Sequence, residues 1–214
     1  MCGRFTHRLT WEHLHGLYHL TDPRKPELDL KPRYSVAPTD LLPVCRLDRQ
    51  GAREIAMLRW GLIPFWAADP KVSFKSINAR AETAATAPAF REAFKRRRCL
   101  VPANGFYEWK KLAGGGKQPY LIQMRDAAPF SFAGLWERWK KGPEPIESFT
   151  IITGEPNSLV ADLHDRMPVI LDPADYDAWL TASDRAALQK LLQPFPRAAH
   201  DHDPCVEPRQ FCQE

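Results

Sequence analysis

The chain has 214 residues, of which 44% are hydrophobic and 11% aromatic, which suits one mixed domain or at most two small ones with a substantial core. Its formal net charge of +4 is mildly basic, which permits an anionic partner without requiring one. No apolar run approaches the roughly 20 residues that cross a bilayer, and the N-terminus lacks the apolar stretch of a secretory signal. We therefore expect a cytoplasmic protein without a membrane segment.

Helix and strand signals alternate irregularly along the chain. Thr10 can cap a helix from Trp11 to about Leu20, and residues 21–43, rich in proline and charge, indicate a loop. Aromatic and β-branched residues predict strands over 57–60, 99–102 continuing towards 106–109, 120–124, 130–136, 149–153 and 167–171. Further helices are predicted over 86–97, from Pro156-Asn157 to about Leu163, after the cap Asp172, and from the cap Ser183 to about Leu192. Gly114-Gly115-Gly116 predicts a hairpin-like loop before strand 120–124.

The predicted strands outnumber the helices and do not alternate regularly with them. This pattern favours an α+β fold, with a mainly antiparallel, barrel-like or sandwich-like sheet flanked by short helices, over a doubly wound parallel sheet. The sequence holds no internal repeat and no long low-complexity linker. We expect a single domain over residues 1–193, followed by a tail, residues 194–214, of uncertain structure.

The cysteine pattern argues against structural metal or disulfide chemistry. The five cysteines are an odd number, and none forms a C-x-x-C pair, so neither a disulfide framework nor a zinc ribbon is expected. The tail holds four potential ligands whose spacing fits no standard zinc pattern: His200, His202, Cys205 and Cys212. We predict neither a metal nor another cofactor.

Cys2 directly follows the initiator Met1. Removal of Met1 would leave an α-amine and a thiol on one residue. The amine can form a Schiff base with an aldehyde, and the thiol can then close on the imine carbon to give a five-membered thiazolidine. In unstructured peptides the two groups titrate at roughly 7.7–8.0 and 8.5, so each supplies some reactive form near neutrality. The alternative is a small residue at a frayed terminus.

Three further polar residues interrupt aromatic or apolar segments, namely Asn78, Glu108 and His164. Glu108 lies between Tyr107 and Trp109 and would shuttle protons with a raised pKa if it points inward, although strand alternation alone favours a solvent-facing side chain. His164 is a candidate general acid or base, or the cap of a short helix. Asn78 either orients an oxygen atom or stabilises a turn.

Arginine and aromatic side chains lie near these candidates in sequence. Arg4, Arg80 and Arg166 each stand within two residues of one of them, and Trp66 belongs to an aromatic segment at 60–66. Arginines hold phosphates and exposed aromatics stack on bases, whereas the alternative places the aromatics in the core. The basic run 95–98 is typical of a solvated helix end, or it attracts phosphate.

Taken together, these segments resemble the SOS response-associated peptidase (SRAP) family. The matching strings are MCGRF at 1–5, SVAPT at 35–39, RWGLIPFW at 59–66, INARAET at 77–83, RCLVPANGFYEW at 98–109, FAGLWE at 132–137 and HDRMPVIL at 164–171. They occur in the family's order and span about residues 1–180.

The resemblance implies a single α+β domain with a barrel-like core and a positively charged groove. It also implies that Met1 is removed and that Cys2 captures the aldehyde of an abasic site in single-stranded DNA. The thiazolidine crosslink would shield the lesion in the DNA-damage (SOS) response, and the protein would be a monomer, nucleoid-associated if bacterial. By motif, Cys2 matches the nucleophile, and three positions complete the catalytic set: Asn78, Glu108 and His164. The positions implied to contact DNA are Arg4, Trp66, Arg80 and Arg166.

Two other functions stay open at this point. The family name implies a thiol peptidase, in which Cys2 attacks the Met1–Cys2 bond or an outside peptide with His164 as base. A non-catalytic single-stranded DNA binder would use the arginines and tryptophans alone. The sequence also departs from the family pattern, because we find no further strand with a Val-Asn pair after Leu192. That departure puts a sheet edge and one wall of the groove in question.

Overall fold

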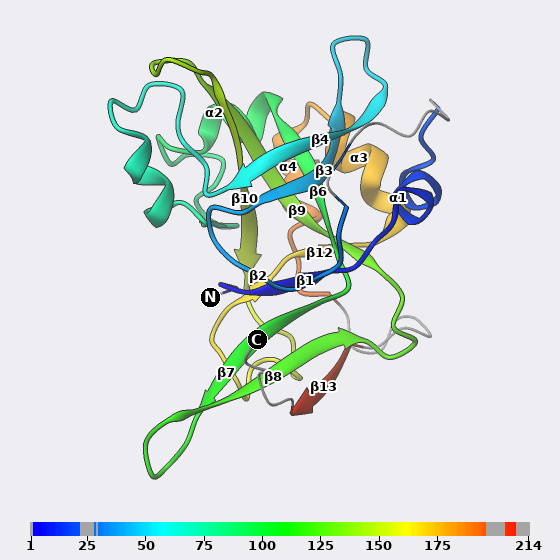
Figure 1. Ribbon diagram of the computed structural model, residues 1–214, viewed down its shortest axis with the longest axis vertical. Helices are drawn as coiled ribbons and strands as arrows, with labels where there is room; N and C mark the ends of the chain where they lie inside the picture. The colour runs from blue at the N-terminus through cyan, green and yellow to red at the C-terminus, as the bar shows by residue number, and fades with distance from the viewer. Residues whose placement is uncertain (1, 22–27, 29, 196–203, 209–214) are drawn as a thin grey trace.

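The computed structural model describes residues 2–21, 28, 30–195 and 204–208, with only the backbone of the last segment. Its centre is a closed ring of five strands, shown in Figure 1: β3 (Leu41–Leu47), β4 (Arg53–Trp60), β6 (Arg98–Ala103), β9 (Phe130–Trp139) and β10 (Ile146–Gly154). The strands pair in the order β10–β4–β3–β6–β9, and β9 pairs again with β10. Only the β4–β10 pair of this ring is parallel. The predicted α+β fold with a mainly antiparallel, barrel-like core is confirmed.

Three short strands extend the barrel at one end of β10. β5 (Asn78–Arg80) runs parallel to β10, whereas β11 (Met167–Pro168) and β12 (Ile170–Leu171) pair antiparallel with β10 and β9. The predicted strand 167–171 is split because Val169 donates its N–H to Ile152 and accepts from the N–H of Ala133. In the register of β10, Thr153 is flanked by Arg80 on one side and by Pro168 on the other. This pairing brings the segment around Asn78 close to the segment that follows His164.

A second sheet lies below the barrel in Figure 1. Its strand order is β13 (Pro204–Pro208), β8 (Lys117–Met124), β7 (Gly105–Lys111), β1 (Phe5–His7) and β2 (Arg33–Val36). A strand does follow Leu192: β13 lacks the Val-Asn pair of the family pattern, but it pairs with β8 along its whole length and covers the sheet edge that was in question. The loop predicted over 21–43 is also wrong in part, since it contains β2 and the start of β3. The single strand expected through 99–109 is two strands in different sheets.

Aromatic side chains join the second sheet to the barrel. Phe5 of β1 meets Trp60 of β4 and Phe132 of β9 edge-on, with ring centroids 5.1 and 5.8 Å apart. Phe106 of β7 meets Phe132 at 6.0 Å. All four rings are buried, and edge-to-face pairs of this kind stabilise a junction beyond the area they bury. Cys2 belongs to the same cluster, so the N-terminal end of β1 is fixed where the two sheets meet.

The helices are short and flank the barrel: α1 (Trp11–Tyr18), α2 (Arg91–Arg96), α3 (Tyr176–Thr181) and α4 (Arg185–Lys190), with 3-10 turns η1 (Pro70–Lys75) and η2 (Pro173–Asp175). Thr10 caps α1 as predicted, because its hydroxyl accepts from the backbone N–H of His13 at 3.4 Å. The helix predicted over 86–97 begins only at Arg91, after turns, and its cap position offers no side-chain hydrogen bond. Within the described residues, no helix has the length and apolar character needed to span a bilayer.

The last helices begin close to their predicted caps. Asp172 accepts from the N–H of Ala174 at 2.9 Å, but it starts the 3-10 turn η2 and not α3 directly. The cap of α4 is Asp184, which accepts from the N–H of Ala186 at 2.9 Å, and not Ser183 as predicted. A carboxylate at this position complements the helix dipole as well as the free N–H groups.

The helix predicted over 156–163 is absent, and residues 158–163 form consecutive turns. Asn157 caps the first of these turns. Its Oδ1 accepts from the N–H groups of Leu159 and Val160 at 3.1 and 3.0 Å, while its Nδ2 donates to the carbonyl of Phe195 at 3.2 Å. The Oδ1 contacts are those of a helix N-cap, and the N–H groups of Ala161 and His164 donate four residues back, to the carbonyls of Asn157 and Val160, but the turns do not continue as a regular helix. The resulting loop ends at His164.

Candidate active site

Cys2 is buried at the junction of the two sheets. Its side chain is 0% exposed, and its Sγ lies 3.9 Å from the carbonyl oxygen of Arg4, to which the thiol donates. Burial raises the pKa of the Cys2 thiol far above its ordinary value, and the nearby Glu108 carboxylate raises it further. The thiol is therefore neutral at physiological pH. Because it is buried, Cys2 is not the frayed terminal residue of the alternative reading.

Asn78 fixes the backbone of Cys2. It is the first residue of β5, and its Nδ2 donates to the Cys2 carbonyl oxygen at 2.9 Å. Its Oδ1 is buried and accepts no hydrogen bond from the described residues. The turn-stabilising alternative is not what this geometry shows, because the contact joins residues 76 positions apart in sequence. Asn78 thus fixes the backbone of Cys2 and keeps one buried acceptor available.

Glu108 points inward from β7. It is only 2% exposed, whereas its neighbours Tyr107 and Trp109 are half-buried, so the solvent-facing alternative is wrong. Burial raises the pKa of the Glu108 carboxyl, and the nearby His164 partly opposes that shift. A carboxyl group held in this way takes up and releases protons closer to neutrality than an exposed glutamate. Glu108 also lies close enough to Cys2 to influence its thiol.

His164 stands at the end of the 158–163 turns, with its side chain 30% exposed. Its Nδ1 lies 2.8 Å from Oδ1 of Asp165 and 3.0 Å from the backbone N of Arg166. The two contacts suit different protonation states: a protonated Nδ1 donates to Asp165, and a bare Nδ1 accepts from Arg166. In either state Nδ1 is engaged locally. The outer nitrogen, Nε2, is therefore the one that can act on a substrate.

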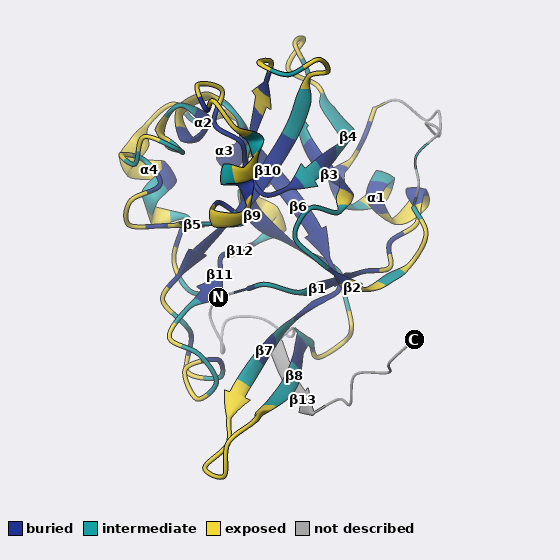
Figure 2. Ribbon diagram, turned by 60° about the vertical axis from the view of Figure 1, so that its left-hand side comes forward, coloured by how far each residue is buried: buried dark blue, intermediate teal, exposed yellow. Residues whose placement is uncertain are grey.

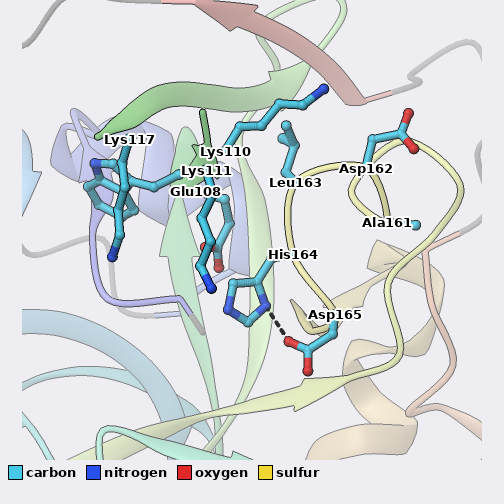
Figure 3. Close-up of a pocket in the computed structure, with 10 residues that line it drawn as sticks. Glu108, Lys110, Lys111, Lys117, Ala161, Asp162, Leu163, His164 and Asp165 are labelled. Atoms are coloured by element: carbon cyan, nitrogen blue, oxygen red, sulfur yellow. Dashed lines mark ion pairs between the residues drawn. The ribbon is translucent and has the colours of Figure 1, made fainter. Parts of the chain in front are cut away.

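An open cavity of about 770 Å³ reaches Glu108 and His164 (Figure 3). The β7–β8 hairpin forms one wall with Lys110, Lys111 and Lys117, and the loop 161–165 forms the other. In Figure 3 the Glu108 carboxylate points towards the imidazole of His164. The two proposed proton carriers therefore face one solvent-accessible space. Asn78 thus hydrogen-bonds Cys2, and Glu108 lies near enough to both Cys2 and His164 to interact with them electrostatically.

The three arginines and Trp66 are placed differently from one another. Arg166 donates to both carboxylate oxygens of Glu82, at 2.5 and 2.9 Å, and to the carbonyl of Thr153 at 2.6 Å. Its hydrogen bonds with Glu82 raise the pKa of Arg166 and lower that of the Glu82 carboxyl. Arg80 is exposed at the end of β5, beside the same Thr153 position of β10. Arg166 is thus already bound within the protein, whereas Arg80 faces solvent.

Arg4 and Trp66 complete the predicted set. Arg4 is half-buried, and its carbonyl oxygen accepts both from the Cys2 thiol and from the N–H of Tyr107, the latter at 2.9 Å. Trp66 is 48% exposed and is held through its indole N–H, which donates to the carbonyl of Pro88 at 3.3 Å. Trp66 is therefore a surface residue and not part of the core.

Sequence reasoning missed several residues of the site. Glu82 and Asp165 belong to the recognised INARAET and HDRMP strings, but nothing in the strings shows that Glu82 pairs with Arg166. The lysines of the hairpin stand outside the catalytic strings, and the signal for them was their clustering on either side of the glycine loop 114–116. Of the potential tail ligands, His200, His202 and Cys212 lie outside the described residues, and only the backbone of Cys205 is described.

Comparison with known proteins identifies the family of the chain. A family model described as SOS response associated peptidase (SRAP) matches residues 1–206. The chain belongs to the SRAP family. Among its relatives, "Abasic site processing protein YoqW" of Bacillus subtilis is 43% identical over 199 residues, covering 91% of this chain and 88% of that protein. "Abasic site processing protein YedK" of Escherichia coli is 33% identical over 183 residues, covering 84% and 79%.

Solved structures show the same fold as this SRAP domain. A crystal structure of a protein from Bacteroides thetaiotaomicron superimposes with a TM-score of 0.84 at 30% identity, covering 96% of this chain and 91% of that one. A second, from Bordetella bronchiseptica, gives 0.80 at 26% identity and covers 98% and 100%. The barrel with its attached five-stranded sheet is thus shared with experimentally determined structures.

Proposed function

We propose that this protein captures abasic sites in single-stranded DNA as a covalent thiazolidine crosslink, formed by Cys2 after removal of Met1. The crosslink would shield the lesion during the DNA-damage response. The observation that carries the proposal is that Asn78 and Glu108 lie beside Cys2 and that His164 shares a cavity with Glu108. The names of the relatives, abasic site processing proteins, support the choice of lesion.

The reaction balances without an oxidant or a reductant. Opening of the sugar hemiacetal moves a proton from the C1′ hydroxyl to the ring oxygen and leaves an aldehyde at C1′. The α-amine of Cys2 adds to C1′, and the carbinolamine loses one water to give an imine. The Cys2 sulfur then bonds to C1′, the π electrons of the C=N bond move to nitrogen, and the thiol proton follows them. The product is protein plus DNA less one water.

Two residues carry these proton transfers, and a third aligns Cys2. His164 faces the cavity and protonates the ring oxygen as the hemiacetal opens. Glu108 carries protons from the amine to the leaving water and later from the thiol towards the nitrogen, a task that suits a buried carboxyl of raised pKa. Asn78 holds the Cys2 carbonyl, so the amine, sulfur and C1′ meet in one small volume.

The state of the Cys2 thiol supports this order of steps over the thiol peptidase alternative. A cysteine peptidase needs a thiolate, held by a lowered pKa next to a histidine. In the chain that still carries Met1, the form on which an autopeptidase would act, burial and Glu108 raise the pKa of the thiol, and the thiol donates to the carbonyl of Arg4. A neutral thiol is adequate for the crosslink, since the amine attacks first and the sulfur follows within the same residue.

DNA would be held by side chains around the catalytic residues. Arg80 is exposed and Arg4 adjoins Cys2, so both can reach phosphates flanking the sugar. Arg166 would reach a phosphate only by sharing its guanidinium with Glu82 or leaving it. The exposed Trp66 offers a surface for stacking on a base or a strand junction. The partner is single-stranded DNA with an abasic site, bound by one protein monomer.

Intact-mass spectrometry after mixing with an abasic single-stranded oligonucleotide tests the proposal. We expect loss of Met1 and an adduct equal to protein plus DNA less one water. An imine has the same mass, so borohydride distinguishes them: it adds two hydrogens to an imine and none to a thiazolidine. The wild-type adduct should be unchanged by borohydride, and any adduct of Cys2→Ala should be reducible. Cys45→Ala, which removes another buried thiol, should behave as wild type.

Other results would select the alternatives. Turnover of peptide substrates without a DNA adduct would favour a thiol peptidase. Equal affinity for intact and abasic strands, with no covalent product, would favour a non-covalent DNA binder. A borohydride-stable adduct from Cys2→Ala would remove the sulfur from the mechanism.

A further inference from the structure

The β7–β8 hairpin carries three lysines beyond Glu108. Pairing of the two strands sets Lys111 directly opposite Lys117, and Lys110 opposite Gln118. All three lysines are exposed, and all three line the cavity that reaches Glu108 and His164 (Figure 3). We call Lys110, Lys111 and Lys117 the lysine rim.

The lysine rim is electrostatically unfavourable in the isolated protein. Like charges directly opposite each other on paired strands destabilise a hairpin, and Lys111 and Lys117 are such a pair. Among the described residues, none of the three lysines forms an ion pair with a carboxylate. A bound anion would relieve this repulsion, and nothing in the packing of the hairpin requires lysine at these positions.

The cavity is also asymmetric in charge. The lysine rim forms the hairpin wall, whereas Asp162 and Asp165 stand on the opposite loop (Figure 3). A chain of phosphates would follow the lysine wall and turn its sugars and bases towards the loop. Because the same cavity ends at Glu108 and His164, a strand whose sugar sits at those residues would continue along the rim.

We propose that the lysine rim binds backbone phosphates of the nucleotides adjoining the abasic site, so that the β7–β8 hairpin is a second, sequence-independent DNA contact. The assignment of this anion as the substrate strand rests on the proposed function. Lysine suits the task because its ammonium is a point charge on a flexible stem and accepts phosphates in a range of positions. Arginines at the lesion would set the register, and the rim would hold the neighbouring strand.

The test compares binding of intact oligothymidylate, which has no lesion, by K110A/K111A/K117A and by a matched triple variant. The control removes the same charge from α4 and from the turn between β3 and β4, at the end of the molecule away from the β7–β8 hairpin in Figure 1: R49A/R185A/K190A. Fluorescence anisotropy is recorded between 50 and 200 mM salt. Loss of three phosphate contacts should reduce the slope of log K against log salt by about 2. Between 50 and 200 mM salt, the affinity of the variant should therefore fall about 15-fold less than that of wild type. A slope equal to that of the control variant would overturn the proposal.

A single charge reversal, at Lys117, separates an effect on DNA binding from an effect on folding. Lys117→Glu places a carboxylate opposite Lys111, so the hairpin gains an attractive pair in place of a repulsive one. We expect a higher melting temperature together with weaker DNA binding. A lower melting temperature, or unchanged DNA affinity, would contradict the role of the lysine rim.

Crosslinking of abasic DNA at saturating concentration distinguishes this proposal from the function on which it rests. The triple variant should reach the wild-type yield there and lose yield only at low DNA concentration. If the wild-type protein forms no adduct but the salt slope still falls, crosslinking is rejected and the phosphate contact stands. If adduct forms normally and the slope is unchanged, the rim is rejected and crosslinking stands.

Discussion

Replacement of Asn78 by alanine tests the proposed alignment of Cys2 for reaction. The change removes the donor that lies 2.9 Å from the carbonyl oxygen of Cys2 and leaves that buried oxygen without its partner. An unsatisfied buried acceptor costs about 1–3 kcal/mol. If about 1.5 kcal/mol of this holds residue 2 in its reactive arrangement, the aligned population falls about tenfold, and so does the crosslinking rate.

The assay is the single-turnover rate of adduct formation on saturating abasic single-stranded DNA, resolved by denaturing electrophoresis. Saturation removes any effect on DNA binding, so the rate reports alignment and chemistry alone. Asn78→Asp is the companion variant, because it keeps the volume but replaces the donor with a carboxylate that repels the Cys2 carbonyl. It should be slower than Asn78→Ala.

Asn104→Ala is the matched control. Asn104 is also a buried asparagine that bonds the backbone near β1, with its Oδ1 accepting from the N–H of Arg8 at 2.7 Å. Its loss should cost about 1 kcal/mol of stability and leave the saturated rate within about twofold of wild type. If Asn78→Ala slows crosslinking no more than Asn104→Ala, the alignment argument is refuted.

Three further predictions concern the other charged groups. Glu108→Gln should slow saturated crosslinking by about 100-fold and flatten its pH profile. Burial raises the pKa of the Glu108 carboxyl in the folded protein, so its ionisation destabilises the fold as pH rises. Urea denaturation should therefore find the variant more stable than wild type at pH values above the raised pKa, and equally stable at low pH. Asp165→Ala removes an exposed partner of His164 and should slow crosslinking by at most about fivefold at neutral pH, far less than His164→Ala, and an equal loss in the two variants would contradict the subsidiary role. Glu82→Gln should lower stability at pH 7 by at most about 1 kcal/mol, because Arg166 lowers the pKa of the half-exposed Glu82 carboxyl. This stability difference should vanish as pH falls through the lowered pKa. Unchanged DNA affinity of the variant would show that the freed Arg166 meets no phosphate.

The sequence predicts local features of this fold better than its long-range pairing. The strands around Phe106 and Phe132 were predicted because aromatic and β-branched residues cluster there. β3 was missed because it contains Pro43, which argues against a central strand. In the structure Pro43 pairs with Met57 on β4, while the other neighbour, β6, pairs with β3 only at Cys45 and Arg46, so the missing N–H of the proline is tolerated.

The candidate site shows the same difference between local features, which the sequence predicts, and long-range contacts, which it does not. The identities of Cys2, Asn78, Glu108 and His164 came from their motifs, but the inward direction of Glu108 did not, since alternation along β7 is satisfied by either face. Burial against the barrel decides it, and that requires the tertiary structure. The hydrogen bond of Asn78 to Cys2 likewise depends on the parallel pairing of β5 with β10.

That pairing has a consequence for how the protein acquires its activity during synthesis. Cys2 leaves the ribosome first, but β5 is held by β10, and β10 must itself close against β4, about 90 positions earlier in the chain. Contacts of such long sequence separation form late in folding. Under the proposed function, the nascent chain would carry a bare aminothiol through most of its translation and gain proton carriers only once His164 had been made. Fast capture of an aldehyde would then be a property of the finished molecule and not of the growing one.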